Sequence, residues 1–160
     1  MRIRNIILIP IIITALIGSV FIADRLKLTG DREAGKFSSV LPDFKTTAAW
    51  AEELWLKYAD DDGRLCITVF DGYADLGDTT VDISCEVCEA IKNSKGYFNY
   101  SFISVRKEYM IFWLDETGYS GLLYSSSPKK VLRLLKKSSY PTLESIRLTD
   151  KFYKVGYFGR

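Results

Sequence analysis

The longest hydrophobic stretch of the chain lies near its start and contains no charged residue. It covers residues 6–23 and follows two arginines, Arg2 and Arg4. A helix of this length rises ~27 Å, which is close to the ~30 Å hydrocarbon core of a bilayer. The stretch therefore predicts a single membrane-spanning helix.

Two interpretations of this stretch stay open: a retained anchor and a secretory signal that is cut away. Signal cleavage needs small residues, but cleavage after Ala23 would put the bulky Phe21 at the third position before the cut. We therefore favour the anchor. Basic residues flank both ends, so charge alone does not orient it. Its similarity to an export signal places the domain that follows outside the cytoplasm, in the periplasm or an equivalent compartment.

Helical periodicity appears first in residues 46–59. Trp50, Leu54 and Tyr58 recur every four residues there and define one apolar face. Thr46 or Thr47 is a suitable N-cap for this helix. The polar residues before it, 24–42, contain Gly and Ser and predict a tether.

A second segment allows two predictions. Residues 79–93 have a helical stripe of apolar side chains and form a predicted helix capped by Asp78. The alternative is a strand over residues 80–83, after which Ser84 caps a helix that begins at Cys85.

Strand patterns fill most of the remaining chain. Residues 64–71 are nearly continuous in apolar and β-branched side chains and predict a central strand. Residues 97–126 alternate in three stretches separated by turns, which predicts an antiparallel meander, and residues 143–158 predict a final hairpin. Because no βαβ rhythm is present, we expect an α+β fold: a largely antiparallel sheet with two or three helices on one face.

Together these patterns predict the organisation of the chain. It comprises a basic tail (residues 1–5), a membrane anchor (6–23), a tether (24–42) and an α+β extracytoplasmic domain (43–160).

Composition excludes several functions. The chain has 160 residues, a net charge of +2 and no histidine, so histidine-dependent nucleophiles and histidine metal sites are absent. The two extra charges are Arg2 and Arg4, and the chain beyond residue 23 is balanced. A nucleic-acid-binding domain normally carries a basic excess. We therefore expect no nucleic-acid partner, and we predict no metal or cofactor.

Three cysteines offer two chemistries. Cys85 and Cys88 form a C-x-x-C pair, which at a helix start supports thiol-disulfide exchange because the helix N-terminus stabilises a thiolate. Glu86 between them opposes this role. The favoured interpretation is structural: Cys85 and Cys88 are core-facing helix residues, or one of them forms a disulfide with Cys66 in an oxidising compartment.

Carboxylates give weaker signals. Asp60, Asp61 and Asp62 resemble the start of a calcium loop, but a strand follows at once, so a solvated helix end fits better. Two carboxylate pairs could in principle support glycoside hydrolysis, which needs two acids. Asp115 and Glu116 fit a turn, whereas Asp71 and Asp75 flank a predicted loop and are a weak candidate site.

A short basic helix is the clearest candidate binding site. Ser127 and Pro128 predict its start, and its basic residues share an arc of ~120°. These are Lys129, Lys130, Arg133, Lys136 and Lys137. The opposite side carries Val131, Leu132, Leu134 and Leu135 and predicts core contacts. The basic residues suit anionic lipid headgroups or an acidic partner, although a simple solvated face is the favoured explanation.

The sequence therefore favours a non-enzymatic, membrane-anchored binding domain. Its predicted role is to capture or inhibit a protein partner, as an immunity or inhibitor protein does, or to serve as an accessory subunit of a membrane complex. The alternative is a thiol-disulfide oxidoreductase that uses Cys85 and Cys88.

Overall fold

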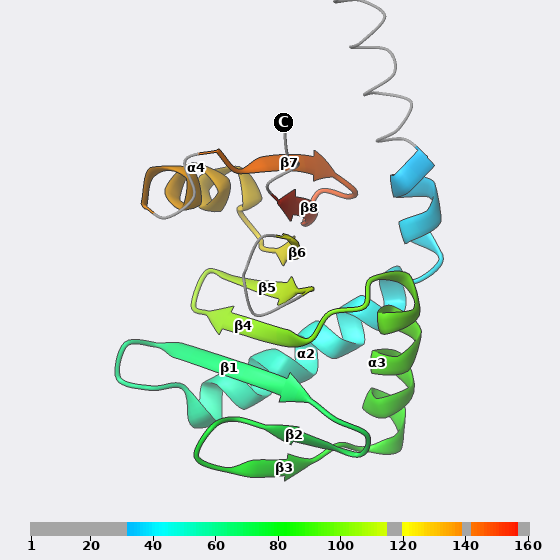
Figure 1. Ribbon diagram of the computed structural model, residues 1–160, viewed down its shortest axis with the longest axis vertical. Coiled ribbons are helices and arrows are strands. Elements are labelled where there is room, and N and C mark those ends of the chain that lie inside the picture. The colour runs from blue at the N-terminus through cyan, green and yellow to red at the C-terminus, as the bar shows by residue number, and fades with distance from the viewer. Residues whose placement is uncertain (1–31, 115–119, 139–141, 157–160) are drawn as a thin grey trace, which may run out of the picture.

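The computed structural model describes residues 32–114, 120–138 and 142–156, which form an α+β domain (Figure 1). Residues 32–38 are helical. The other helices are α2 (Leu41–Tyr58), α3 (Cys85–Tyr97) and α4 (Pro128–Ser138). The strands are β1 (Arg64–Val69), β2 (Tyr73–Asp75), β3 (Thr80–Asp82), β4 (Phe102–Arg106), β5 (Tyr109–Trp113), β6 (Ser120–Tyr124), β7 (Glu144–Arg147) and β8 (Phe152–Gly156).

Several predicted features lie outside the described residues. They are the tail, the membrane anchor, the first part of the tether (24–31) and the turn at 115–118. Within the described part of the chain, no helix is both long and apolar enough to cross a bilayer. The membrane anchor therefore stays a prediction from the sequence.

The eight strands form one antiparallel sheet in the order β3-β2-β1-β4-β5-β6-β8-β7. The predicted meander corresponds to β4, β5 and β6, and the predicted final hairpin to β7 and β8. The predicted central strand is β1, which pairs with β2 on one side and β4 on the other. The α+β class and the largely antiparallel sheet are thus confirmed.

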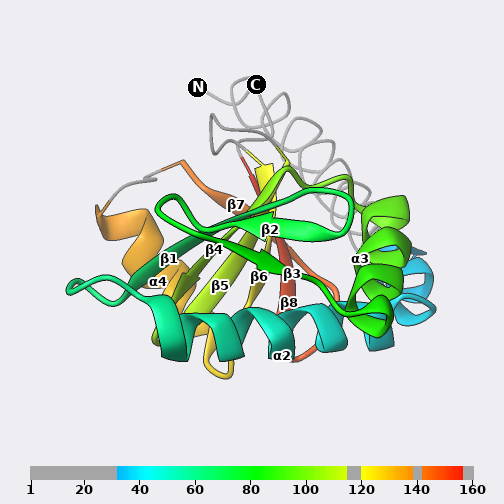
Figure 2. The ribbon, with the colours of Figure 1, turned by 90° about the horizontal axis from the view of Figure 1, so that it is seen from below.

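One face of the sheet, here called the inner face, packs against α2. Phe44 and the small residues Ala48 and Ala51 lie four and three residues apart on α2 and are buried. The ring centroid of Phe44 lies 5.4 Å from that of Phe112 on β5 and 6.1 Å from that of Phe152 on β8. This helix therefore spans several strands and organises the main core, with α3 packed beside it (Figure 2).

The other face, here called the outer face, is covered by α4 over only part of the sheet. A second core joins β5, β6 and β8 to that helix; it contains Ile111, Leu123, Val155, Val131, Leu132 and Leu135. The predicted two or three helices on one face thus correspond to α2 and α3, whereas the position of α4 on the opposite face differs from the prediction. Strands β5 and β6 carry buried residues at consecutive positions, so both of their faces need a cover. Figure 2 shows α4 on one side of the strands and α2 and α3 on the other.

Part of the expected tether belongs to the folded domain. Residues 32–38 are helical, and Phe37 is 0% exposed. The Phe37 ring lies 5.2 Å from Phe44 and 5.1 Å from Phe152, centroid to centroid. The core thus begins before residue 43, because one aromatic side chain in a polar segment fills it.

Two helix boundaries also differ from the prediction. Helix α2 begins at Leu41, with Pro42 in its first turn, so Thr47 is not a cap. Its buried hydroxyl instead donates to the Asp43 carbonyl oxygen at 2.9 Å. Helix α3 follows the alternative prediction: it starts at Cys85, and the Ser84 hydroxyl accepts from the Val87 amide at 3.4 Å. The favoured helix over residues 79–93 is wrong because residues 80–82 form β3.

Candidate functional site

The predicted basic helix exists as α4 and presents its charged residues to solvent. All five predicted binding residues are exposed; we call them the basic face: Lys129, Lys130, Arg133, Lys136 and Lys137. Pro128 starts the helix, and the Ser127 carbonyl oxygen accepts from the amides of Lys130 and Val131. The basic face is therefore fixed to a helix whose opposite side is anchored in the outer-face core.

Two contacts refine this helix. Lys130 is partly engaged, because its Nζ lies 2.8 Å from Glu108 Oε1 in the β4–β5 turn. Leu134 was expected in the core, but its side chain is 48% exposed. At 100° per residue, it falls at the border between the basic arc and the buried arc. The solvent side of α4 is thus cationic with one apolar residue at its edge.

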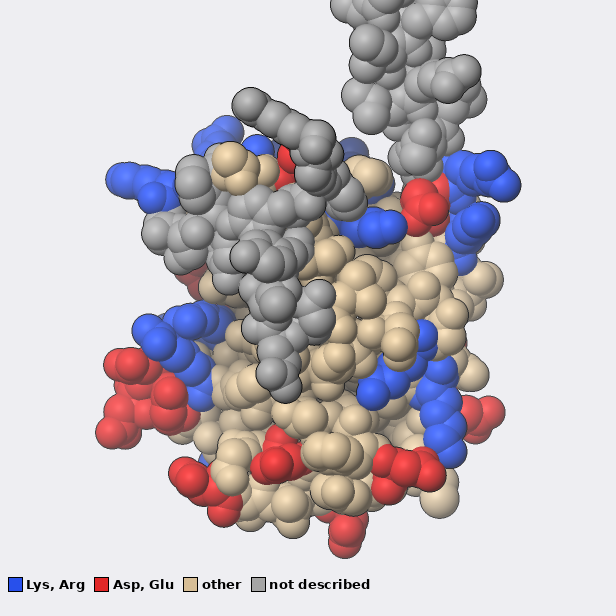
Figure 3. Space-filling view, viewed as in Figure 1, with Lys and Arg blue, Asp and Glu red and all other residues tan. Residues whose placement is uncertain are grey.

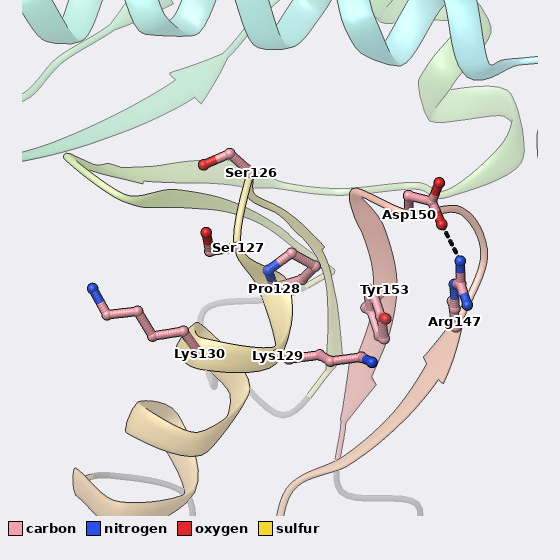
Figure 4. A pocket seen from close by; sticks show the side chains of 8 residues that line it. All are labelled: Ser126, Ser127, Pro128, Lys129, Lys130, Arg147, Asp150 and Tyr153. Atoms are coloured by element: carbon pink, nitrogen blue, oxygen red, sulfur yellow. Dashed lines mark hydrogen bonds and ion pairs between the residues drawn. The ribbon is translucent and has the colours of Figure 1, made fainter.

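A cleft of about 320 Å³ lies where α4 starts (Figure 4). The Lys129 side chain extends toward Tyr153 on β8, whereas Lys130 points away from that strand (Figure 4). On the far side Arg147 pairs with Asp150. Since Asp150 neutralises Arg147, the excess positive charge of the cleft comes from Lys129 and Lys130 of α4.

The cysteines do not form the predicted disulfide; all three are free. Leu65, Ile67 and Val69 of β1 point to the inner face, so Cys66 points to the outer face, away from α3. Partial burial of the thiol and, after it, the nearby Asp75 raise the pKa of Cys66. A disulfide between Cys66 and Cys85 or Cys88 would have to pass through the sheet.

The predicted thiol pair lies at the start of α3, as its redox role requires. Cys85 is exposed in the first turn, while Cys88 is half-buried and lines a groove beside β1. Glu86 is also in the first turn, where its charge opposes a thiolate. The helix start therefore matches the oxidoreductase alternative, whereas the local charge does not.

The predicted carboxylates accept hydrogen bonds from backbone amides or form surface ion pairs. Asp60 Oδ1 accepts from the Arg64 amide at 2.7 Å, and Asp75 Oδ1 accepts from the Gly77 amide at 2.8 Å. Asp71 Oδ1 lies 3.4 Å from Lys92 Nζ and forms an ion pair with it. Within the described residues, no group of Cys, Asp or Glu is placed to hold a metal ion.

A pair of exposed aromatic rings lies at the β1–β2 turn and was not predicted from the sequence. Phe70 and Tyr73, which we call the aromatic pair, are 45% and 42% exposed. Their rings stack with centroids 4.9 Å apart and planes 14° apart. They flank Asp71 and Gly72, and Gly72 adopts a φ of 85° that suits glycine. An Asp-Gly dipeptide between apolar residues is a hairpin signal that would have located this turn.

The aromatic pair borders an apolar groove of about 200 Å³ between the end of β1 and α3. Its lining includes Ile83, Ile91 and Cys88. Lys95 closes one side, because its Nζ donates to the Val69 carbonyl oxygen at 3.3 Å; burial lowers the pKa of Lys95. Phe70 itself lines this groove, so the pair and the groove form one continuous surface. Among the described helices, none covers the outer face of β1, β2 and β3.

Charge is unevenly distributed between the two candidate surfaces. The β1–β2 turn and the β2–β3 hairpin carry Asp71, Asp75, Asp78 and Asp82 and no basic residue. Helix α4 carries five basic residues and no acid. In Figure 3 the acids gather toward the end with the β2–β3 hairpin, and many Lys and Arg lie toward the end with α4. The two surfaces therefore suit ligands of opposite charge.

No protein-family model matches the chain, and no curated protein or solved structure matches it significantly. The fold defines an α+β domain with one antiparallel sheet. Its function must therefore be inferred from the chemistry of the two surfaces.

Proposed function

We propose that the chain is a non-enzymatic, membrane-tethered domain that binds a basic protein partner through the aromatic pair. The exposed stack of Phe70 and Tyr73 is the observation that carries this proposal. The uncharged stretch over residues 6–23 supports the tether. The role is that of a capturing or inhibitory domain, or of an accessory subunit in a membrane complex.

The aromatic pair has the properties of a binding hot spot. Aromatic side chains dominate the energetics of protein interfaces, especially next to pockets that exclude water. The stack holds Phe70 and Tyr73 in place before binding, which lowers the entropy lost on association. The adjacent groove offers apolar walls for a side chain of the partner. These features favour a protein ligand over a small polar one.

The acids around the pair select the charge of the partner. Asp82 lies opposite Tyr73 on β3, and Asp78 lies in the β2–β3 turn. Both are exposed and form no ion pair in the described structure. Complementary charge raises association rates and suppresses wrong partners. The favoured partner surface is therefore basic at its rim, with an apolar residue at its centre.

Site-specific photo-crosslinking tests this assignment. A photoreactive amino acid replaces Tyr73 in the full-length protein, in the membrane of its own cell. The control position is Leu56 on α2, which is 73% exposed. We expect one adduct, with a basic protein, from position 73 and none from position 56. Equal adducts from both positions would contradict the proposal.

Variants then quantify the contact with the identified partner. Phe70→Ala is expected to weaken binding at least ~30-fold, as loss of a hot-spot side chain costs ~2 kcal/mol or more. Asp78→Lys with Asp82→Lys should slow association, and Leu56→Ala should change neither quantity. Normal binding by Phe70→Ala would exclude the aromatic pair as the site.

A second candidate is the thiol-disulfide oxidoreductase, which the position of Cys85 in the first turn of α3 favours. Reduction of insulin by the purified protein, lost in both Cys85→Ser and Cys88→Ser, would support it. A protein without this activity would leave the binding function as the better account.

A further inference from the structure

The basic face lies at the end of the molecule where the described chain begins. Figure 1 shows residues 32–38 and α4 toward the same end, and the β2–β3 hairpin at the opposite end. Residues 32–38 add Arg32 and Lys36 to that end. The chain thus enters the domain at its basic end and presents the aromatic pair at its far, acidic end.

We propose that the basic face of α4 docks on the anionic headgroups of the membrane that holds residues 6–23. This inference rests on the membrane tether of the proposed function. It assigns the basic face to lipid and leaves the aromatic pair, at the other end, facing the partner. The tether and α4 then act together as two contacts with one bilayer.

The connection to the predicted anchor is short enough to favour this docking. Residues 24–31 separate the apolar stretch from the first described helix. Eight residues span at most ~28 Å when fully extended. The domain is therefore confined next to the bilayer, where the effective concentration of headgroups is high and a weak attraction suffices.

The chemistry of α4 suits a lipid surface. Each Lys or Arg close to an anionic membrane favours the bound state by about fivefold. Arg133, Lys136 and Lys137 form no ion pair within the described structure, so their charges are available. The partly exposed Leu134 lies beside them, in the arrangement of interfacial helices.

The helix docks as part of the folded domain. Val131, Leu132 and Leu135 are held in the outer-face core, so they do not insert into the bilayer. Only the basic face and the edge residue Leu134 reach the headgroups. The contact is therefore electrostatic and must weaken with salt.

A fluorescent probe in the full-length protein tests the docking. The three cysteines are replaced by Ser, and an environment-sensitive fluorophore is attached to Leu134→Cys in one protein and to Thr79→Cys in another. Both are inserted in nanodiscs of phosphatidylcholine alone or with 30% phosphatidylglycerol. We expect a blue shift with anionic lipid at position 134 only, reversed by 0.5 M NaCl.

Two matched double charge reversals distinguish a contact made by α4 from a general effect of the net charge of the protein. Arg133→Glu with Lys137→Glu should lower the ratio of docked to undocked protein about 25-fold or more, from two fivefold contributions. Lys45→Glu with Lys57→Glu makes the same change in charge on α2 and should leave the ratio unchanged. Circular dichroism checks that both variants are folded.

Three results would overturn the inference. They are an equal signal at position 134 in both lipid compositions, a shift that persists in high salt, and an equal loss in the two charge-reversal variants. A chain that does not insert into the discs refutes the tether itself. That outcome is distinct from an inserted chain whose probe does not respond, which refutes only the docking.

Discussion

The two halves of the sheet differ in how they are covered. Strands β5, β6 and β8 lie between α2 on the inner face and α4 on the outer face. Strands β1, β2 and β3 share the inner core, but Cys66 and Phe70 on their outer face are exposed. Both halves belong to one continuous hydrogen-bonded sheet.

This difference in cover suggests that one half of the sheet contributes mainly to folding stability and the other mainly to binding. Apolar residues covered on both faces contribute most to folding, since their area is removed from water. Exposed aromatic residues contribute less to folding and are available to a partner. The doubly covered half therefore supports the sheet, and the singly covered half carries the candidate protein-binding site.

The largest expected contrast is between outer-face positions in the two halves. Leu123→Ala removes a 0% exposed side chain under α4 and should cost ~2–5 kcal/mol of unfolding free energy. Cys66→Ala, at an exposed outer-face position of β1, should cost less than ~0.5 kcal/mol. Urea unfolding of both variants measures the difference. Similar costs would mean that the outer face of β1 is also part of a core.

Alkaline pH tests the inner face that both halves share. Burial raises the pKa of Tyr100 to about 12, and its hydroxyl lies 3.0 Å from Ser94 Oγ. A raised pKa favours the protonated form in the folded state, so stability is complete below pH ~10 and falls as pH approaches ~12. Two pKa units correspond to ~2–3 kcal/mol for this residue.

The control for this titration is Tyr100→Phe, which should lose less stability between pH 9 and 11.5. Burial, followed by Glu33, also raises the pKa of Tyr97 to about 12, so a smaller loss should persist in the variant. Lys95 has the opposite effect on the change of stability with pH, because burial lowers its pKa in the folded state. Parallel urea-unfolding curves of wild type and variant across this range would contradict a buried Tyr100 hydroxyl.

Two glycines test local packing in the two halves. A Cβ at Gly121 on β6 would lie 2.7 Å from Ile111 Cγ2 and 3.1 Å from the Phe112 carbonyl oxygen. Gly121→Ala should therefore cost ~1–3 kcal/mol through overpacking. A Cβ at Gly96 on α3 meets nothing within 4 Å, so Gly96→Ala should stabilise by ~0.4–1 kcal/mol. Thermal unfolding of both variants should give shifts of opposite sign.

The sequence predicted the parts of the fold that local patterns control. The meander has clear alternation and short turns, and α4 has Ser-Pro at its start and a strong amphipathic pattern. Which face of the sheet a helix covers is a long-range choice, and the pattern of α4 alone does not contain it. Phe37 was missed for a related reason, since a single aromatic residue in a polar segment becomes core only through Phe44 and Phe152.

The candidate sites follow the same division. The basic face depends on helical periodicity alone and was predicted residue by residue. The aromatic pair depends on β2, which has three residues and too little length for a periodic signal. The sequence pattern there predicts a loop, which does not make Phe70 and Tyr73 neighbours. The predicted disulfide failed for a similar reason: the side on which Cys66 lies depends on the register of β1.

Only a small loss of stability is expected from a change in the aromatic pair itself. Phe70→Ala removes a half-exposed ring and its stack with Tyr73, which should cost ~0.5–1 kcal/mol of unfolding free energy. Gly72 and the β1–β2 pairing remain, so the hairpin should persist. Urea unfolding measures the cost, and amide exchange checks the hairpin. A cost near 3 kcal/mol would show that Phe70 is a core residue, and a ring needed to hold the sheet together would not be available to a partner.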